Sequence, residues 1–266
     1  MKPPVFDDSW TEDLLALYQH DMQEIWDRSI APQVWNQYHN QLDLYLSLAS
    51  QKDVLDILDV GCAQGTLALK LAEVGHNVMA VDLRQEFLDY AESRYEYGEI
   101  EFVQGNVLEL ELDRSFDLIF ANQIVEHLVY PDQLLSRLKA CLKPGGMLVM
   151  TTPNCNYIKN TLPSFRELGD PKDWEHMQFT ADGDGHFYAY FREELVELFE
   201  VAGFIEVQAR FFESPMISGH MKVRYVHDYV PVQLLRMIDR IIVDTPWLGR
   251  KLTHQLMVTG ISPKYA

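Results

Sequence analysis

The segment from Val54 to Asp82 constrains the fold more than any other part of the chain. It contains an apolar run over 54–60, a turn over 61–65, a helical pattern that stops at Gly75, and a second apolar run that ends at Asp82. Glycine in the turn allows a sharp change of direction and leaves no side chain in the way of a ligand. The order strand, turn, helix, strand and acid suits a nucleotide-bearing cofactor, because the final carboxylate can accept hydrogen bonds from ribose hydroxyls.

The glycine spacing in this turn separates two classes of cofactor. A dinucleotide site uses G-x-G-x-x-G, in which the third glycine allows close packing around a pyrophosphate. Here Gly61 and Gly65 are separated by three residues, Ala63 lies between them, and Thr66 follows. The sequence therefore does not carry a pyrophosphate fingerprint, and a nicotinamide-dependent oxidoreductase is disfavoured.

The rest of the chain continues to alternate between strand and helix patterns. Helical patterns are predicted to end at Gly98 and to cover 193–202, and the turn at 143–146 is predicted to precede the fifth strand. This alternation predicts an α/β fold, with a doubly wound, seven-stranded, mostly parallel sheet and helices on both faces. The predicted strands are 54–60, 77–82, 100–103, 116–121, 147–152, 204–211 and 255–261.

Four parts of the chain are predicted. They are an N-terminal helical cover over 1–50, a core over 51–211, a helical insertion over 212–253 between the last two strands, and the last strand of the core sheet over 254–266. The cover is rich in Trp and Tyr, which suit the wall of an acceptor pocket. The insertion has an apolar helical face beside Arg236 and Arg240. A lid, a dimer face and an interfacial helix in contact with lipid remain open for it.

Composition narrows the class of partner. The formal net charge is −18, with 40 acidic against 22 basic side chains, so a polyanion would be repelled and nucleic-acid binding is not expected. No apolar run reaches the ~18 residues of a membrane span, and neither an integral membrane segment nor a signal peptide is expected. Three cysteines without paired spacing favour reduced thiols and a cytoplasmic location.

The motifs together resemble those of class I S-adenosylmethionine-dependent methyltransferases. The run Asp59-Val60-Gly61-Cys62-Ala63-Gln64-Gly65 is similar to the first motif of that family, with alanine in place of its middle glycine. Residues 116–121 resemble the fourth-strand motif, and residues 142–146 resemble the turn before the fifth strand. The pattern is nearest to the ubiquinone-pathway O-methyltransferase-like group (types 11 and 23). The resemblance implies a Rossmann-like core, S-adenosyl-L-methionine as cofactor and S-adenosyl-L-homocysteine as its product.

The resemblance also implies which residues bind the cofactor. The first acid of the motif lies near the methionine amino group, the second near the ribose, and the backbone of the turn wraps the cofactor between them. Asn106 takes the place of an acid that accepts from the adenine amino group, and its carbonyl oxygen can still accept. The implied cofactor-binding residues are Asp59, Gly61, Cys62, Ala63, Gly65, Asp82, Leu83, Gly105, Asn106, Val107, Asn122 and Gln123.

The segment 121–127 bears on the acceptor. It lacks the Asn/Asp-Pro-Pro-aromatic tetrapeptide with which related enzymes methylate amino groups of bases and of glutamine. Some ubiquinone-pathway relatives carry Glu-x-x-Glu-His as a divalent-metal site, and here Gln123 replaces the first glutamate. Glu126 and His127 alone make a poor metal site, so we expect no metal and place both residues at a helix start and pocket wall.

Methyl transfer to oxygen needs a base, because the acceptor hydroxyl must lose its proton. His186, in the glycine-containing run over 182–187, is the first candidate, since related enzymes often place an acceptor-contacting histidine there. His127 is the second catalytic candidate, and His176 is a further reserve.

The sequence thus predicts a methyltransferase that modifies a small-molecule acceptor at oxygen by in-line transfer. Nitrogen or carbon acceptors on a natural product, sugar or lipid-linked intermediate remain open, as does a non-catalytic subunit that only binds S-adenosylmethionine. The expected partner is the small-molecule acceptor, with peripheral lipid contact left open. The expected assembly is a monomer or a homodimer.

Overall fold

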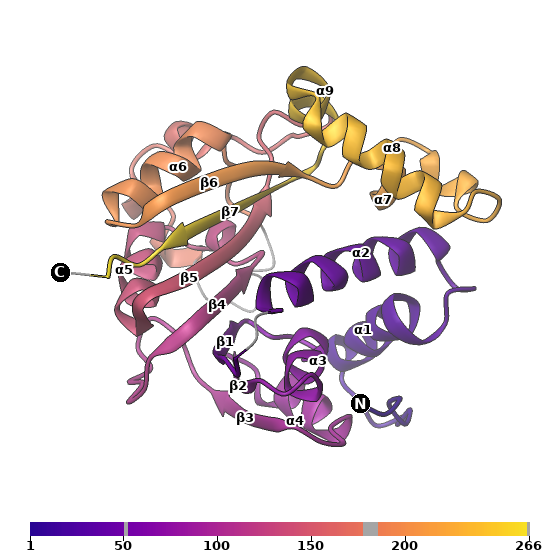
Figure 1. Cartoon of the computed structure of the whole chain (residues 1–266), viewed down its shortest axis with the longest axis horizontal. Helices are drawn as coiled ribbons and strands as arrows, with labels where there is room; N and C mark the ends of the chain where they lie inside the picture. Colours follow the sequence, from indigo (N-terminus) through magenta and orange to yellow (C-terminus); the bar gives the residue numbers. More distant parts are fainter. Residues whose placement is uncertain (51–52, 178–185, 265–266) are drawn as a thin grey trace. The chain divides into compact units, whose positions relative to one another are not determined.

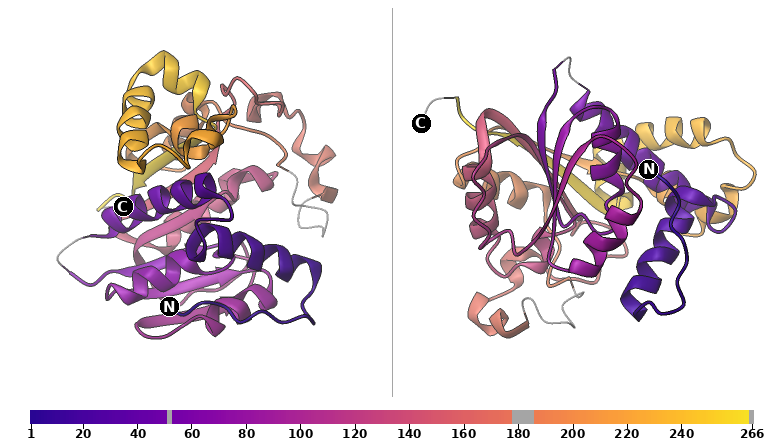
Figure 2. Two further views of the ribbon diagram at one scale, coloured as in Figure 1. Left: turned by 90° about the vertical axis from the view of Figure 1, so that its right-hand side faces the viewer. Right: turned by 90° about the horizontal axis from the view of Figure 1, so that it is seen from below.

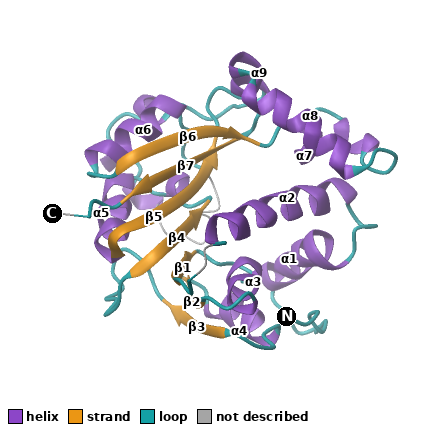
Figure 3. Cartoon of the chain, in the orientation of Figure 1, coloured by secondary structure: helices purple, strands orange, loops and turns teal. Residues whose placement is uncertain are grey.

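Residues 1–50, 53–177 and 186–264 are described by the computed structural model of the chain (Figure 1). They divide into two compact units. The first comprises Met1–Glu111 with Pro215–Ile238, and the second comprises Leu112–Ser214 with Asp239–Ala266. Figure 3 shows that helices alternate with strands in both units.

The first unit contains three parallel strands in the order β3-β2-β1. They are β1 (Asp56–Val60), β2 (Asn77–Asp82) and β3 (Glu99–Gln104). Parallel strands are covered on both faces and therefore read as continuous apolar runs. Strand β1 follows this rule, since Ile57 and Leu58 are buried, and it begins two residues later than predicted because Val54 is exposed.

Helices α3 (Thr66–Glu73) and α4 (Gln85–Ser93) connect these strands. Helix α4 ends at Ser93 and not at Gly98 as predicted, because the N–H of Arg94 bonds to Ala91 O and closes the last turn. The N-terminal residues form α1 (Glu12–Asp21), a π-helical turn η1 (Met22–Trp26) and α2 (Pro32–Ala49). Thr11 caps α1, since its hydroxyl accepts from Leu14 N at 3.3 Å. The predicted helical N-terminal region is therefore present.

The second unit has four strands in the order β4-β5-β7-β6. Strands β4 (Phe116–Asn122) and β5 (Leu142–Pro153) are parallel, while β7 (Gln255–Ile261) runs antiparallel to both β5 and β6 (Ile205–Phe212). Helices α5 (Pro131–Cys141) and α6 (Arg192–Val201) precede β5 and β6. Seven strands in the described residues, mostly parallel and separated by helices, confirm the predicted fold class.

The predicted start of the fifth strand is also wrong. The turn expected over 143–146 lies within β5, which already pairs with β4 at Leu142 opposite Phe116. The register shifts before Leu118 pairs with Met147, so the residues between form an irregularity of the strand. The glycines at 145–146 indicated a change in backbone direction, and Gly145 does have a left-handed φ of 84°. Strand pairing nevertheless continues on both sides of it.

The insertion between β6 and β7 is helical as predicted (Figure 2). It contains α7 (Pro215–Ser218), a 3-10 turn η6 (Val223–Val226), α8 (Val232–Asp244) and α9 (Pro246–Leu252). Residues 232–238 of α8 belong to the first unit and the remainder to the second. The four predicted domain boundaries stay predictions. None of the helices in the described part of the chain is long and apolar enough to cross a membrane.

Candidate functional site

The turn after β1 is held to the end of β2 by backbone hydrogen bonds. The N–H groups of Gly61 and Cys62 donate to Val81 O at 2.8 and 3.1 Å. Gly65 closes the turn with a left-handed φ of 75°, and a Cβ at this position would lie 2.5 Å from Cβ of Ala91. Two carbon atoms cannot approach so closely, so this position requires glycine. The turn presents backbone at Gly61, which is exposed.

Ala63 occupies the place of the middle glycine and also has a left-handed φ, of 47°. Its N–H donates to Asp82 Oδ2 at 3.0 Å, which ties the turn to the acid that ends β2. Ala63 also packs against an apolar cluster from the N-terminal region and α4 that contains Trp10, Leu14, Leu17, Tyr18, Phe87 and Tyr90. The alanine methyl group therefore faces the N-terminal helical region.

Asp82 is buried and firmly oriented. Its Oδ1 accepts from Arg84 N at 3.0 Å, and the Arg84 Nε lies 3.8 Å from the same oxygen. Each carboxylate oxygen has two lone pairs, so the group can still accept from hydroxyl donors. The neighbouring Leu83 is an exposed apolar side chain. This arrangement suits a ribose, as the sequence predicts.

Asp59, in the buried part of β1, is close enough to Asp82 for their charges to interact. Burial, and then the charge of Asp82, raise the pKa of Asp59 to about 7. Burial also raises the pKa of the Cys62 thiol, and the two aspartates add to this effect. Within the described residues Asp59 forms no ion pair. Two adjacent buried acids favour a ligand that brings an ammonium group and hydroxyls, and they disfavour a pyrophosphate.

The loop after β3 lies against the same acid. Gly105 N donates to Asp82 O at 3.0 Å, and the following Val107 is buried. The Asn106 side-chain oxygen accepts from Leu108 N at 3.1 Å, which forms an Asx turn. One lone pair of that oxygen is left for a ligand. The contact with adenine stays a prediction.

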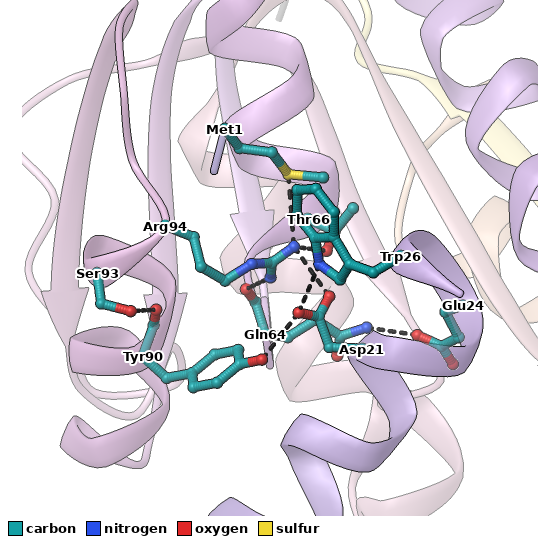
Figure 4. A network of polar contacts seen from close by, with 9 residues as sticks. All are labelled: Met1, Asp21, Glu24, Trp26, Gln64, Thr66, Tyr90, Ser93 and Arg94. Atoms are coloured by element: carbon teal, nitrogen blue, oxygen red, sulfur yellow. Dashed lines mark hydrogen bonds and ion pairs between the residues drawn. The ribbon is translucent and has the colours of Figure 1, made fainter. Parts of the chain in front are cut away.

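A buried arginine that sequence patterns did not reveal also holds the turn (Figure 4). The Arg94 guanidinium donates to Gln64 O at 2.6 Å and to Thr66 Oγ1 at 3.0 Å, and it pairs with Asp21 Oδ1 at 2.9 Å. Arg94 and Asp21 are both 0% exposed. The arginine thus connects α1 to the backbone on which the cofactor is predicted to lie.

The other carboxylate oxygen of Asp21 accepts hydrogen bonds from two side chains. Its Oδ2 accepts from the Tyr90 hydroxyl at 2.8 Å and from Trp26 Nε1 at 3.0 Å. Burial raises the pKa of Asp21, and the charge of Arg94 opposes this shift. Oδ2 therefore has two hydrogen-bond donors, whereas Oδ1 is compensated by its ion pair with Arg94 and accepts no hydrogen bond within the described residues.

Glu24 contacts the turn from the π-helical turn η1. Gln64 Nε2 donates to Glu24 Oε2 at 2.6 Å. Burial, and then the charge of Asp21, raise the pKa of Glu24 to about 8. Short π-helical turns are rare and are often found at functional sites. No pattern in 22–26 distinguishes such a turn from an ordinary helix, so this contact could not be predicted from the sequence.

Asn122, the last residue of β4, and Gln123, which follows it, belong to the second unit. Asn122 Oδ1 accepts from Thr151 Oγ1 at 3.1 Å, and Gln123 has a left-handed φ of 53°. In the orientation that satisfies both sides of its amide, Gln123 donates to Glu126 Oε1 at 3.0 Å and accepts from Thr152 N at 3.2 Å. Both side chains therefore have protein partners, and their predicted role in cofactor binding stays a prediction.

The structure brings His127 and His186 together with Glu126. His186 Nε2 lies 3.9 Å from Glu126 Oε1, and the two imidazole rings are in an edge-on arrangement with centroids 4.8 Å apart. Backbone contact causes this proximity, because Phe187 N donates to Glu126 O at 3.0 Å. Residues 182–185, which complete the predicted glycine-containing run, lie outside the described residues. We call these three side chains the histidine cluster.

Tyr188 also holds the segment that contains Glu126 and His127 against the segment that contains His186. Its hydroxyl, fully buried, lies 2.9 Å from Val125 O and also contacts Leu128 O. Tyr188 therefore fixes the 3-10 turn η2 (Val125–His127) relative to the segment that carries His186. His176, the reserve candidate, is exposed and is not part of the cluster.

Burial sets the protonation states of the cluster. It raises the pKa of Glu126 to about 8, although Thr152 Oγ1 donates to Oε2 at 3.1 Å. Burial, and then the neighbouring His127, lower the pKa of His186. Near pH 7 Glu126 is mainly protonated and His186 is neutral. A neutral imidazole that is 38% exposed can accept a proton from a ligand.

The same three side chains are the group among the described residues that could hold a metal ion. Their potential ligand atoms all lie within 4.8 Å of one another. A metal would require Glu126 to lose its proton, and burial opposes this loss. The absence of a bound metal, expected from the sequence, stays a prediction.

The chain is similar in sequence to known methyltransferases. Residues 58–150 match the family described as "Methyltransferase domain". The ubiquinone biosynthesis O-methyltransferase of Rickettsia canadensis is 33% identical over 176 residues, which are 64% of this chain and 74% of that protein. The protein of the same name from Rickettsia akari is 34% identical over 102 residues, which are 38% of this chain and 41% of the relative. The chain thus spans less than half of that relative's length.

A solved structure shows the same fold over nearly the whole chain. It is phosphoethanolamine N-methyltransferase 2 of Haemonchus contortus with phosphomonomethylethanolamine and S-adenosylhomocysteine. The TM-score is 0.60 at 18% identity, and the match covers 97% of this chain and 59% of that one. This likeness shows the Rossmann-like fold. The chain belongs to the class I S-adenosylmethionine-dependent methyltransferases, a family of enzymes.

The residues of the first unit fit the cofactor of this family. Gly61 offers exposed backbone, Asp82 retains acceptor capacity for hydroxyls, and the acid pair of Asp59 and Asp82 favours an ammonium group. The predicted recognition, fold class and cofactor are confirmed at the level of the family.

Proposed function

We propose that the protein transfers a methyl group from S-adenosylmethionine to an oxygen atom of a small-molecule acceptor. The observation that carries this proposal is the histidine cluster, in which neutral His186 lies beside buried Glu126. A hydroxyl acceptor must lose a proton during transfer, and a neutral, half-exposed imidazole is suited to take it. The Rickettsia relatives are named as O-methyltransferases, which supports oxygen over nitrogen or carbon.

The first unit binds and orients the cofactor in this proposal. S-adenosylmethionine supplies, when bound, a methyl group already activated by a sulfonium. Asp82 accepts from the ribose hydroxyls, and its bonds from Ala63 and Arg84 backbone fix its orientation. Asp59 accepts from the methionine amino group as it loses its own proton. The N–H groups of Gly61 and Cys62 are used by Val81 O, so the turn keeps its shape without a ligand.

The second unit supplies the base. His186 Nε2 takes the proton of the acceptor hydroxyl as the oxygen gains its methyl group. The resulting imidazolium lies 3.9 Å from Glu126 Oε1, where a positive charge lowers the cost of ionising the buried carboxyl. Glu126 therefore acts as a positioning residue that stabilises the protonated imidazole. His127 borders the same space and, through its charge, helps to keep the pKa of His186 low.

The test starts from S-adenosylhomocysteine release with a panel of phenols, amines and carbon acids. For the best acceptor, His186→Ala should lower kcat by roughly 10²- to 10⁴-fold. The Kd for S-adenosylhomocysteine should not change, because His186 is assigned to the acceptor. His176→Ala is the matched control, since it removes an exposed imidazole outside the cluster and should retain full turnover.

Three outcomes would contradict the proposal. Full turnover by His186→Ala would remove this residue as the base. Turnover with amines alone would move the reaction to nitrogen, and cofactor binding without turnover on any acceptor would favour a non-catalytic subunit.

A requirement for a metal ion is tested separately. Dialysis against a chelator should leave kcat unchanged, whereas loss of activity that Mg²⁺ or Zn²⁺ restores would convert the histidine cluster into a metal site.

The finer assignments of location and partner remain predictions. Cys62, Cys141 and Cys155 are free thiols, which is consistent with a reducing compartment such as the cytoplasm. The acidic net charge supports a partner other than nucleic acid.

A further inference from the structure

Helix α8 has an apolar face that is not covered. Leu234, Met237 and Ile241 are 43%, 55% and 60% exposed, and their spacing places them on one side of the helix. The opposite side is the one that packs, because Leu235 is buried and buried Asp239 accepts from Ser214 N at 2.6 Å. Both sides of α8 are therefore apolar, although only one of them contacts the protein.

Exposed aromatic residues precede and follow this helix in the chain. Tyr229 precedes α8 and is 85% exposed, while Trp247 in α9 is 70% exposed. Helix α9 starts directly after α8, with Thr245 Oγ1 donating to Ile241 O at 2.7 Å. Exposed Trp and Tyr beside an aliphatic stripe are typical of segments that lie at a membrane interface, because one end of each ring is apolar and the other is polar.

The segment 220–252, which contains η6, α8 and α9, has a net charge opposite in sign to that of the rest of the chain. Between residues 220 and 252 there are six Lys and Arg against three Asp and Glu. The remainder has 16 basic against 37 acidic side chains. Five of the six bases are exposed, and they are Lys222, Arg224, Arg240, Arg250 and Lys251. One acid, Asp239, is buried against Ser214, so the accessible charge of the segment is more positive than the count implies.

From these observations we propose that the segment 220–252 docks on the surface of an anionic lipid bilayer. The apolar face of α8 and Trp247 enter the boundary between headgroups and acyl chains, and the exposed bases contact lipid phosphates. The strongly acidic remainder of the chain is repelled by the same surface, so the charge distribution favours this one segment as the contact. A second copy of the chain would present the same basic segment, and like charges would oppose pairing through it.

The docking surface does not depend on the proposed function. Vesicle binding needs neither acceptor nor turnover, so it can be measured even if the oxygen-methylation proposal fails. We expect the full chain to sediment with vesicles of phosphatidylcholine and phosphatidylglycerol, and to stay in solution with phosphatidylcholine alone. Binding should weaken as salt rises, because screening reduces attraction between bases and phosphates.

Two variants separate the apolar contribution from the charge contribution. Leu234→Gln with Met237→Gln and Ile241→Gln removes the apolar face while keeping residues that favour a helix. Arg240→Glu with Lys251→Glu reverses two exposed charges. Each should lower the vesicle partition coefficient at least about tenfold. Thermal stabilisation by S-adenosylhomocysteine should stay as in the wild type, which shows that the variants are folded.

The matched controls change the same chemistry elsewhere. Val54→Gln with Val74→Gln and Val201→Gln removes three scattered exposed apolar side chains. Lys159→Glu with Lys172→Glu produces the same change in net charge as the double variant above. Both controls should bind vesicles like the wild type.

Equal loss in the controls would attribute binding to overall hydrophobicity or charge and overturn the proposal. Equal binding to neutral and anionic vesicles, or no binding to either, would also overturn it. Light scattering measures whether the chain is a monomer or a dimer in solution. A wild-type dimer that the α8 triple variant converts to a monomer would overturn the proposal and make this face a homodimer interface instead.

Discussion

Asp59 and Glu126 are both buried acids with a raised pKa, but the two regions around them are built differently. Asp59 lies in β1, just before a turn whose parts come from one continuous stretch of the chain, and its neighbour is another acid, Asp82. Glu126 meets His186 across a gap of many residues, and backbone hydrogen bonds hold the two segments together. The proposed binding of a cationic cofactor in the first region and the proposed proton transfer in the second therefore rest on different kinds of structural support.

The first region depends on Arg94, so the largest effect is expected there. Arg94→Met should lower the free energy of unfolding by about 3–5 kcal/mol, because it leaves Asp21 buried without its cation. Chemical denaturation measures this loss. Lys143→Met is the control, since Lys143 and Asp117 form a partly exposed pair at 2.8 Å and such pairs contribute about 0–1 kcal/mol. Equal losses in the two variants would show that the buried network is not special.

The pH dependence of stability distinguishes the two acids. Unfolding releases Asp59 and Glu126 to their ordinary pKa values of 3.8 and 4.5, whereas in the folded chain these values are about 7 and about 8. Below the unfolded values both states are protonated. As pH rises, the unfolded state loses its protons first, so stability falls until each folded pKa is passed. The free energy of unfolding of the wild type should therefore fall steadily between about pH 5 and about pH 8.5.

Glu126→Gln and Asp59→Asn should each make this decline less steep. Saturating S-adenosylhomocysteine sharpens the comparison, because its ammonium group should remove the contribution of Asp59 and leave that of Glu126. Calorimetric titration near pH 7 in buffers of different ionisation enthalpy should then show proton release on binding. Proton uptake, or release that persists in Asp59→Asn, would contradict the assignment of Asp59.

Asp82→Ala tests whether cofactor binding belongs to the first region. It removes the acceptor of two backbone N–H groups and of the proposed ribose hydrogen bonds, so the Kd for S-adenosylhomocysteine should rise about 10- to 100-fold. Asp117→Ala, at a partly exposed acid in β4, should bind normally. If His186→Ala weakened binding as much as Asp82→Ala does, the division of roles between the two regions would be wrong.

The same division explains what the sequence could predict. Asp59, the turn and Asp82 lie in one run, where glycine positions and apolar periodicity are local signals. The seven strands followed from similar local patterns, with errors of a few residues at their ends. His186 was a candidate from its sequence context, but its contact with Glu126 depends on the hydrogen bond from Phe187 to Glu126.

Other features could not be predicted because they depend only on tertiary packing. Arg94 follows an amphipathic helix as an ordinary basic residue would, and nothing local indicates that it is buried against Asp21. The π-helical turn that carries Glu24 has no distinguishing pattern. The exposed face of α8 was visible as apolar residues, yet the sequence could not show which side of that helix packs.

The substitution Ala63→Gly should have the smallest effect on the free energy of unfolding, and it tests the backbone geometry of the first region. The left-handed backbone of Ala63 costs an L-residue about 1–2 kcal/mol, which Ala63→Gly would relieve. The substitution also makes the unfolded chain more flexible, at about 0.4–1 kcal/mol, and deletes a methyl group that packs against the aromatic cluster, at about 0.8 kcal/mol. These contributions nearly cancel, so the free energy of unfolding should change by less than about 1 kcal/mol. Denaturant titration would measure it, and a loss above about 2 kcal/mol would mean that contact with the N-terminal helices, and not backbone geometry, determines the residue at this position.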